Sequence, residues 1–376
     1  MNSFEPSQGA LTSFESALAA LLDGLAPVPP TCLPLSEGLG RIAAEMRPLR
    51  DALPPRSIAV IDGWAFRALD LAGASAYAPV PLGSPPVWVE AGEAMPEGCD
   101  CVLEADLVDC SGPMAQVFAE AIPGRGIRRA GEDMAAERPA SLPGRRLSAV
   151  DLLALRSAGL KEVAVRAPPL RVIDVTAASS AGLTARFVLE SAVAAGAAVA
   201  CIETVGRDAK SIAGALDGSP CDLILLIGGT GAGRTDATAD ALAARGALVA
   251  HEIALQPGQT AAVGRLGDLP VVALPGAPDQ AFAAFLALVQ PIIDRLAGRS
   301  ASRGMVLPLA RKVSSAVGMA ELVVVKREEA AWMPLAAGDL SLDQMRMADA
   351  WFIVPGESEG HAAGTPVEAL PHRDFT

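Results

Sequence analysis

The chain contains 376 residues, of which 51% are hydrophobic, and its 43 acidic and 30 basic residues give a formal net charge of −13. At roughly 150 residues per domain this length predicts about two to four domains, and the hydrophobic content excludes a mainly disordered chain. The negative charge argues against nucleic acid as a partner, because phosphate backbones attract basic surfaces.

Cysteine usage and the absence of leader-like segments indicate the compartment. The six cysteines form no C-x-x-C pair and the three histidines form no i, i+4 pair, so neither a disulfide framework nor a zinc site is expected. The N-terminus has no basic segment followed by an apolar one, and the most apolar long stretch, 271–293, is broken by three prolines and an aspartate. We therefore predict a cytoplasmic protein without a membrane segment.

The first part of the chain predicts a helical layer that encloses an inserted, mostly β region. Thr12 and Glu15 have the spacing of a capping box, and apolar residues follow at helical spacing until Gly24. Short apolar runs broken by proline and glycine come next, and a second helix is expected over 147–160. The predicted domains are residues 1–47 together with 141–167 (helical) and residues 48–140 (mostly β).

The second part of the chain predicts a doubly wound α/β domain and a small β domain. Strands and helices alternate after residue 168, which is typical of a parallel sheet with helices on both faces. The expected strands are 170–175, 197–204, 223–227 and 271–274, and the expected helices are 183–194, 209–216, 237–244 and 280–296. The α/β domain is assigned to residues 168–300 and the C-terminal β domain to residues 301–376, with strands at 321–326 and 351–354.

A glycine-rich segment follows the strand predicted at 223–227. Its residues are Gly228, Gly229, Thr230, Gly231 and Gly233. Bare backbone N–H groups next to a helix N-terminus can converge on an anion, so we predict a phosphate or carboxylate site. The spacing fits neither the dinucleotide fingerprint nor the P-loop. The alternative is a tight strand-to-helix turn with Thr235 or Asp236 as the helix cap.

A second turn, which contains Pro275 and Pro278, follows the next predicted strand. It is therefore expected at the same carboxyl-end edge of the sheet, where open α/β sheets bind their ligands. Taken alone, a Pro-Gly-x-Pro segment is more often only a turn.

Two acidic residues stand out in the inserted region. Asp62 precedes Gly63 within an apolar run, where a buried carboxylate needs a partner or a metal, although an Asp-Gly β-turn is the simpler interpretation. Asp133 lies in the chain's basic cluster, which suits phosphate and is equally consistent with a solvated face neutralised by Glu132 and Asp133. The arginines of this cluster are Arg125, Arg128, Arg129 and Arg138.

In this order, the landmarks resemble the molybdopterin molybdenumtransferase family, of the MoeA and gephyrin E-domain type, over nearly the whole chain. Residues 57–65 resemble its S-A-M-D-G-Y-A motif, and residues 127–133 resemble I-R-x-x-G-E-D. Residues 222–236 resemble its D-x-x-x-x-x-G-G-x-S-x-G-x-x-D strand and loop, and residues 274–278 resemble L-P-G-N-P. Further similar segments are 37–45, 348–355 and 364–367.

The resemblance implies an enzyme of molybdenum cofactor biosynthesis that ligates molybdate to adenylylated molybdopterin with magnesium. It places the site between the α/β domain of one subunit and the inserted domain of its partner in a homodimer. It implies catalytic roles for Asp62, Asp133 and Asp236, with Asp236 as the metal ligand. The ligand contacts it implies are the pterin phosphate at the glycine segment, the pterin at Pro275 and Pro278, and neutral donors at Ser179, Ser180, Gln256 and Gln259.

The chain departs from the family at four ligand-facing motifs. Ser179 and Ser180 stand where the family's S-T-G-D-E-L has two acids, and Gln256 and Gln259 replace the lysines of K-P-G-K-P. Ala91 replaces a threonine, and residues 336–339 replace Q-G-S. Each lost charge-assisted contact typically forfeits about 1–3 kcal/mol, so affinity for oxyanions is expected to fall.

Three functions stay open on this sequence. The first is a working molybdotransferase that has substituted its ligands. The second is a non-catalytic paralogue that binds a pterin or nucleotide and acts as a cofactor carrier or partner protein. The third is a structural dimer that acts only through protein contacts.

Overall fold

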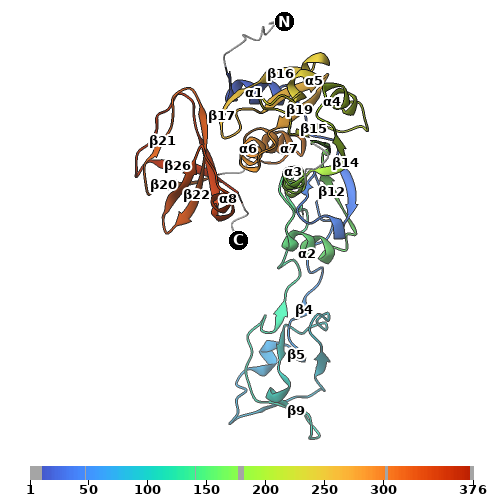
Figure 1. The fold of residues 1–376 in the computed structure, drawn as a ribbon. Helices are drawn as coiled ribbons and strands as arrows, with labels where there is room; N and C mark the ends of the chain where they lie inside the picture. The colour runs from blue at the N-terminus through green and yellow to red at the C-terminus, as the bar shows by residue number, and fades with distance from the viewer. Residues whose placement is uncertain (1–10, 47, 140, 177–181, 301–303, 373–376) are drawn as a thin grey trace. The chain divides into compact units, whose positions relative to one another are not determined.

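The computed structural model describes residues 11–46, 48–139, 141–176, 182–300 and 304–372 (Figure 1). The chain divides into two compact units. The first unit comprises residues 1–45, 143–148 and 162–376, and the second comprises residues 46–142 and 149–161. The finer division into four domains stays a prediction. Within the described ranges, no helix is both long and apolar enough to cross a membrane.

A six-stranded sheet forms the centre of the first unit, with the strand order β14-β13-β15-β19-β18-β16. The strands are β13 (Pro169–Val175), β14 (Ala198–Val205), β15 (Leu223–Ile227), β16 (Leu248–His251), β18 (Ala262–Leu266) and β19 (Leu269–Leu274). The neighbours from β14 to β19 pair in parallel, whereas β18 pairs antiparallel with β19 and with β16. The α/β prediction is therefore confirmed, but the expectation of a wholly parallel sheet is wrong at this edge. A two-residue turn at Gly267, whose φ is +63°, joins β18 to β19 and makes this pair a hairpin.

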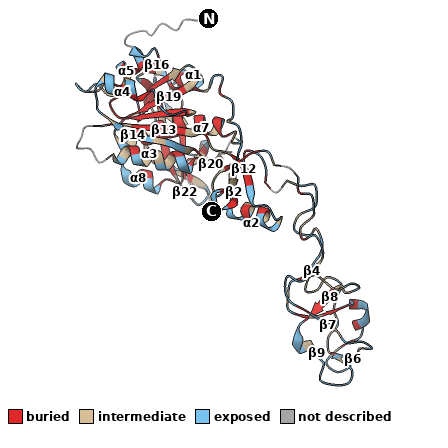
Figure 2. Ribbon diagram, turned by 90° about the vertical axis from the view of Figure 1, so that its right-hand side faces the viewer, coloured by how far each residue is buried: buried red, intermediate tan, exposed pale blue. Residues whose placement is uncertain are grey.

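Helices cover both faces of this sheet. They are α1 (Phe14–Leu22), α3 (Leu183–Ala194), α4 (Ala209–Ala215), α5 (Thr238–Ala244), α6 (Pro278–Ala284) and α7 (Gln290–Leu296), with a π-helical turn at Phe285–Val289 between the last two. Leu223 and Leu225 of β15 belong to the core that contains α1, α3, α6 and α7. Ile224 and Leu226 belong to the core that contains α4 and α5. Successive side chains of the strand thus enter opposite layers, and Figure 2 shows the buried strands between helices with exposed outer faces.

The start of α1 differs from the sequence prediction. Ser13, not Thr12, is the N-cap, because its hydroxyl accepts a hydrogen bond from the backbone N–H of Ser16 at 3.2 Å. Thr12 instead lies in the short strand β1 (Thr12–Ser13), which pairs in parallel with β17 (Ile253–Gln256). Thr12 and Ser13 are both residue types that cap helices, so the sequence left the first residue of the helix ambiguous. The pairing of Thr12 with β17 places the cap at Ser13.

The C-terminal strands join β1 and β17 in a second sheet. Its strand order is β1-β17-β22-β24-β26-β20, and β23 pairs with β22. The further elements are β20 (Met305–Pro308), β22 (Ala320–Glu328), β23 (Ala331–Ala337), β24 (Ala350–Val354) and β26 (Pro366–Pro371), with α8 (Leu342–Met347) and the pair β21 (Val313–Ser314) and β25 (Gly360–His361). Trp332, Val323 and Phe352 are buried in its core. Both strands expected here are present, each slightly longer than predicted.

A small three-stranded sheet, β2-β12-β3, completes the first unit, and the second unit is built from short strands. The sheet of the first unit contains β2 (Thr31–Pro34), β3 (Ile42–Ala43) and β12 (Glu162–Arg166). The second unit contains the sheets β7-β5-β8, β6-β10-β9 and β11-β4, together with helix α2. Their bounds are β4 (Ile58–Ala59), β5 (Gly63–Phe66), β6 (Val80–Pro81), β7 (Val87–Val89), β8 (Cys101–Leu103), β9 (Val108–Asp109), β10 (Gln116–Val117), β11 (Ile127–Arg128) and α2 (Ala149–Ser157).

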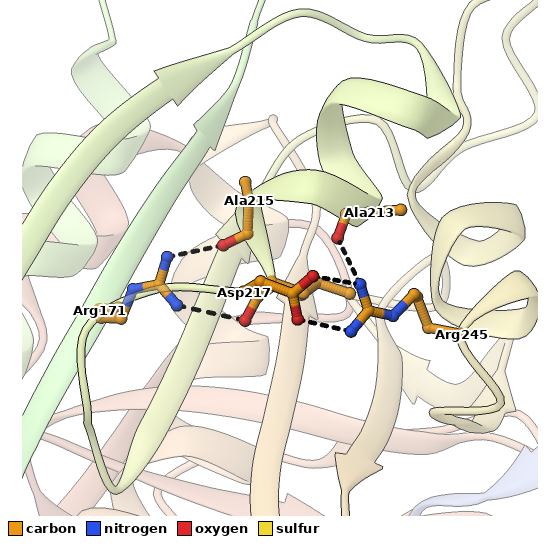
Figure 3. Close-up of polar contacts among 6 residues, drawn as sticks. Arg171, Ala213, Ala215, Asp217 and Arg245 are labelled. Carbon is orange, nitrogen blue, oxygen red and sulfur yellow. Dashed lines mark hydrogen bonds and ion pairs between the residues drawn. The ribbon is translucent and has the colours of Figure 1, made fainter.

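Two arginines cap the C-terminal end of α4 (Figure 3). Arg171, buried on β13, donates to the carbonyl oxygens of Ala215 at 2.6 Å and Leu216 at 3.3 Å, and pairs with the Glu203 carboxylate at 2.5 Å. Arg245 donates to the carbonyl oxygen of Ala213 and pairs with Asp217. Because helix C-termini carry unpaired carbonyls and partial negative charge, both guanidinium groups stabilise this end of the helix.

Candidate functional site

A crevice of about 440 Å³ lies at the carboxyl ends of β13, β15 and β19. Its lining includes Asp174, Thr176, Thr184, Arg207, Gly228 and Pro278. An ideal Cβ on Gly276 would lie 3.6 Å from the Cα of Gly228, so the turns after β15 and β19 are in close approach. The hydroxyl of Thr184 donates to the carbonyl oxygen of Gly276 at 2.8 Å and holds the second turn. The two turns thus meet at one crevice, as parallel strand order predicts.

Hydrogen bonds hold three successive carbonyl groups of the glycine segment. The hydroxyl of Thr238 donates to the Gly228 oxygen at 2.9 Å, and the backbone N–H of Thr238 donates to the Gly229 oxygen at 3.0 Å. The Thr230 oxygen lies 2.9 Å from Nε2 of His251. In a trans peptide the carbonyl and the following N–H point in opposite directions. The N–H groups of Gly229, Thr230 and Gly231 therefore point away from these contacts.

Those three N–H groups belong to residues that are buried (Gly229 and Thr230) or half-buried (Gly231). None of them donates a hydrogen bond to a residue within the described part of the chain. Gly228 and Gly229 have φ values of +95° and +68°, a left-handed conformation that suits glycine. Adding a Cβ to Gly228 would place it 2.7 Å from the Val175 oxygen. Successive free N–H groups in such a turn form a concave anion-binding site.

Asp236 clamps the end of this segment and does not cap the helix. One of its carboxylate oxygens accepts the N–H of Gly233 at 3.2 Å, and the other lies 3.9 Å from the Arg207 guanidinium. Helix α5 begins at Thr238, and its N-cap position is Ala237, which makes no side-chain capping hydrogen bond. The alternative in which Thr235 or Asp236 caps this helix is therefore wrong. Thr235 instead accepts a hydrogen bond from Arg207 at 3.2 Å. A hydrogen-bonded turn between Gly233 and Asp236 precedes the helix, which begins one residue later than predicted.

Sequence reasoning missed Arg207 and Asp174, which both line the crevice. Arg207 follows β14 and brings a positive charge next to the glycine segment, which suits a phosphate ligand. Asp174 is on β13, and burial raises the pKa of its carboxyl. Both residues lie near the carboxyl ends of their strands, a position that could have marked them, but neither belongs to a local motif.

The raised pKa of Asp174 predicts a pH-dependent gain in stability for Asp174→Asn. A carboxyl whose folded pKa is above its unfolded value stabilises the fold at low pH, and this contribution is lost as the pH rises through the folded pKa. We therefore expect the asparagine variant to unfold at a higher temperature than the wild type at pH 7–8, with a difference that shrinks as the pH falls toward the ordinary aspartate range. Thermal unfolding between pH 8 and about pH 4 checks this. A variant that is no more stable than the wild type at pH 8, or a difference that does not shrink toward pH 4, would contradict it.

The predicted neutral donors fall in two places. Ser179 and Ser180 lie outside the described residues. Gln256 ends β17, and both Gln256 and Gln259 are exposed. An ideal Cβ on Gly338 would lie 3.2 Å from the Gln256 amide nitrogen and 2.4 Å from a Glu321 carboxylate oxygen. Two segments that depart from the family, 256–260 and 336–339, are therefore in contact.

Asp62 and Asp133 belong to the second unit, and each has a partner there. Asp62 lies between β4 and β5, and its carboxylate accepts the N–H of Ala91 at 2.7 Å. Asp133 forms an ion pair with Arg128 at 2.9 Å, in which both side chains are about half exposed. These contacts agree with the turn interpretation for Asp62 and with the neutralised-face interpretation for Asp133.

Comparisons with known proteins extend over both halves of the chain. A family model of the MoeA N-terminal region, domains I and II, matches residues 12–159, and one of a probable molybdopterin binding domain matches residues 182–295. Molybdopterin molybdenumtransferase 2 of Mycobacterium tuberculosis (strain H37Rv) is 30% identical over 302 residues, which cover 70% of this chain and 74% of that protein. Molybdopterin molybdenumtransferase of Synechococcus elongatus is 26% identical over 400 residues. This alignment covers 95% of this chain and 99% of that protein.

Solved structures give the same correspondence at the level of the fold. The molybdopterin biosynthesis MoeA protein of Pyrococcus horikoshii superimposes with a TM-score of 0.70 at 25% identity. The superposition covers 97% of this chain and 100% of that protein.

Proposed function

Because the chain belongs to the molybdopterin molybdenumtransferase family, a family of transferases in molybdenum cofactor biosynthesis, we propose that it binds adenylylated molybdopterin and inserts molybdate into it. The observation that carries this proposal is the set of three N–H groups at Gly229, Thr230 and Gly231 that have no acceptor among the described residues. They lie beside a crevice lined by Arg207. A phosphate accepts several hydrogen bonds at once, so this arrangement suits the phosphate of the pterin.

Each group of the proposed site, in the crevice or around it, has a proposed role. The three N–H groups and the Arg207 guanidinium bind phosphate oxygens, and Pro275 and Pro278 border the pterin. Gln256 and Gln259 supply neutral donors for molybdate. Because an oxyanion and a phosphate repel one another, donors fixed before the ligand arrives lower the cost of bringing them together.

Magnesium fits this site only as a cation shared with the ligand. The described residues contain no group of three or more His, Cys, Asp or Glu side chains placed to hold a metal. Mg²⁺ is, however, commonly held by one or two carboxylates together with substrate phosphates. We propose Asp236 as its protein ligand, and Asp174 offers a second carboxylate at the crevice. When bound, the cation would neutralise charge on the phosphate.

A second candidate function is non-catalytic binding of a pterin or nucleotide. The exposed amides of Gln256 and Gln259, which stand where charged donors are expected, favour it. Such a protein would carry the cofactor or act as a partner to another enzyme, and would bind the pterin without turnover.

The proposed reaction has a direct assay. Adenylylated molybdopterin is incubated with the wild type, with and without molybdate and magnesium, and release of AMP is measured. A working transferase releases AMP only when molybdate is present. Saturable binding without molybdate-dependent release would favour the second candidate function.

We predict a homodimer that works in the cytoplasm. The resemblance places residues of the inserted region of one subunit at the α/β site of the other, so a monomer would lack part of its site. Sedimentation equilibrium at micromolar concentration is expected to give twice the chain mass of 38.3 kDa. A species of single-chain mass would contradict the shared site.

We predict that Asp236→Ala weakens binding of phosphorylated pterin more than Asp62→Ala does. Asp236 holds the N–H of Gly233 and lies near Arg207, so its loss loosens the anion site itself. Asp62 is expected to reach only the far end of the cleft, from the partner subunit. Calorimetric titration with molybdopterin in the presence of magnesium compares the two variants. Wild-type affinity in the Asp236 variant would remove this assignment.

A further inference from the structure

His251 links the edge strand β16 to the glycine segment. Its Nε2 lies 2.9 Å from the carbonyl oxygen of Thr230, 21 residues earlier in the chain. A carbonyl oxygen only accepts hydrogen bonds, so Nε2 carries the hydrogen and donates it. The other two carbonyls of this turn are held by Thr238, which follows directly in α5. The Thr230 carbonyl is thus the one whose direction depends on a separate strand.

The Thr230–Gly231 peptide needs such a contact. It has a glycine on either side, and glycine allows the backbone to rotate widely. Thr230 is 3% exposed, and its buried hydroxyl has no hydrogen-bond partner among the described residues. Leaving a buried hydroxyl unpaired costs free energy, so conformations that release it compete with the observed one. The bond from His251 opposes that release.

We propose that His251 is a positioning residue, which fixes the Thr230–Gly231 peptide so that the N–H of Gly231 points toward the bound phosphate. The argument is geometric, because in a trans peptide the N–H of Gly231 points away from the oxygen that His251 holds. Losing this bond lets the peptide rotate and removes one of three donors from the anion site. The inference rests on the proposed function for the identity of the ligand.

A comparison of two variants isolates the donor. His251→Phe keeps a flat ring and removes the N–H, whereas His251→Gln keeps an N–H on a chain of similar reach. His361→Phe, at a histidine of β25 in the C-terminal sheet, is the matched control. All three proteins should have wild-type circular dichroism.

The first readout uses ligand-free protein. Arg234 is exposed within the loop, so trypsin cleavage after it reports how readily the loop opens. Mass spectrometry is expected to show cleavage about fivefold faster in His251→Phe, and wild-type rates in His251→Gln and His361→Phe. A wild-type cleavage rate in His251→Phe would overturn the positioning role whether or not the pterin binds.

The second readout is affinity for molybdopterin, measured by calorimetry. His251→Phe is expected to bind roughly tenfold more weakly, which corresponds to one lost hydrogen bond, and His251→Gln within about threefold of the wild type. A glutamine variant as weak as the phenylalanine variant would overturn the donor role. Absence of binding by the wild type would instead contradict the proposed function, and the cleavage comparison would still decide the role of His251.

Discussion

Replacing Arg171 by methionine is expected to lower the free energy of unfolding by about 3 kcal/mol. The guanidinium group is buried, with 4% of the side chain exposed, and it donates to two helix-end carbonyls (Figure 3). It also pairs with the Glu203 carboxylate. Methionine has a similar length but no donor, so all three acceptors lose a partner in or near the core. Glu203 is one third exposed and keeps part of its hydration, which places the estimate at the low end for a broken buried pair.

Arg245→Met is the matched control, because Arg245 caps the same helix from a more exposed position. The Asp217 side chain that it pairs with is 68% exposed, so solvent replaces much of the lost interaction. Urea unfolding followed by circular dichroism compares the two variants. A shift in midpoint for Arg171→Met no larger than that for Arg245→Met would contradict the account of the buried cap.

The second large effect is expected from restoring the family's charges. If the wild type releases AMP in a molybdate-dependent manner, the combined change Ser180→Glu, Gln256→Lys and Gln259→Lys should slow that release at least about tenfold. A site arranged around neutral donors is disturbed by three new charges. Gln256 and the Glu321 carboxylate both approach Gly338, so a lysine at 256 is expected to pair with Glu321 instead of the oxyanion.

The same pair of proteins separates the transferase from the two non-catalytic functions. A silent wild type with an active triple variant would identify a lapsed enzyme whose scaffold is intact. Two silent proteins that remain folded and dimeric would favour the binding or interaction functions and contradict the transferase proposal. Circular dichroism and sedimentation of the triple variant are the controls for folding and assembly.

The strongly patterned elements of the fold were predictable from the sequence. Leu223–Ile227 and Leu183–Ala194 have the predicted bounds, because a continuous apolar run and a helical repeat are both local signals. The meeting of the glycine and proline turns also followed from sequence, since both come after parallel strands. The antiparallel strands β16 and β18 were missed. The Gly267-Asp268 turn between β18 and β19 was the available signal, but alternation in the flanking residues is weak.

The missed parts of the site depend on tertiary contacts. Asp174 is on β13, Arg207 follows β14 and His251 is on β16. They meet the crevice or the loop only after the sheet has formed. None of them has a motif around it, so spacing along the chain carries no information about their proximity. The predicted cap of α5 was wrong for a similar reason, because the Asp236 carboxylate accepts a hydrogen bond within the loop and not from the helix.

The most direct measurement is a calorimetric titration of the wild type with molybdopterin and with the same pterin lacking its phosphate. If the N–H groups of Gly229, Thr230 and Gly231 hold the phosphate, molybdopterin should bind saturably at one site per chain. The dephosphorylated pterin should then bind at least about a hundredfold more weakly, because several charge-assisted hydrogen bonds are lost. Equal affinity for the two pterins, or no binding of either, would contradict the phosphate site at the glycine segment.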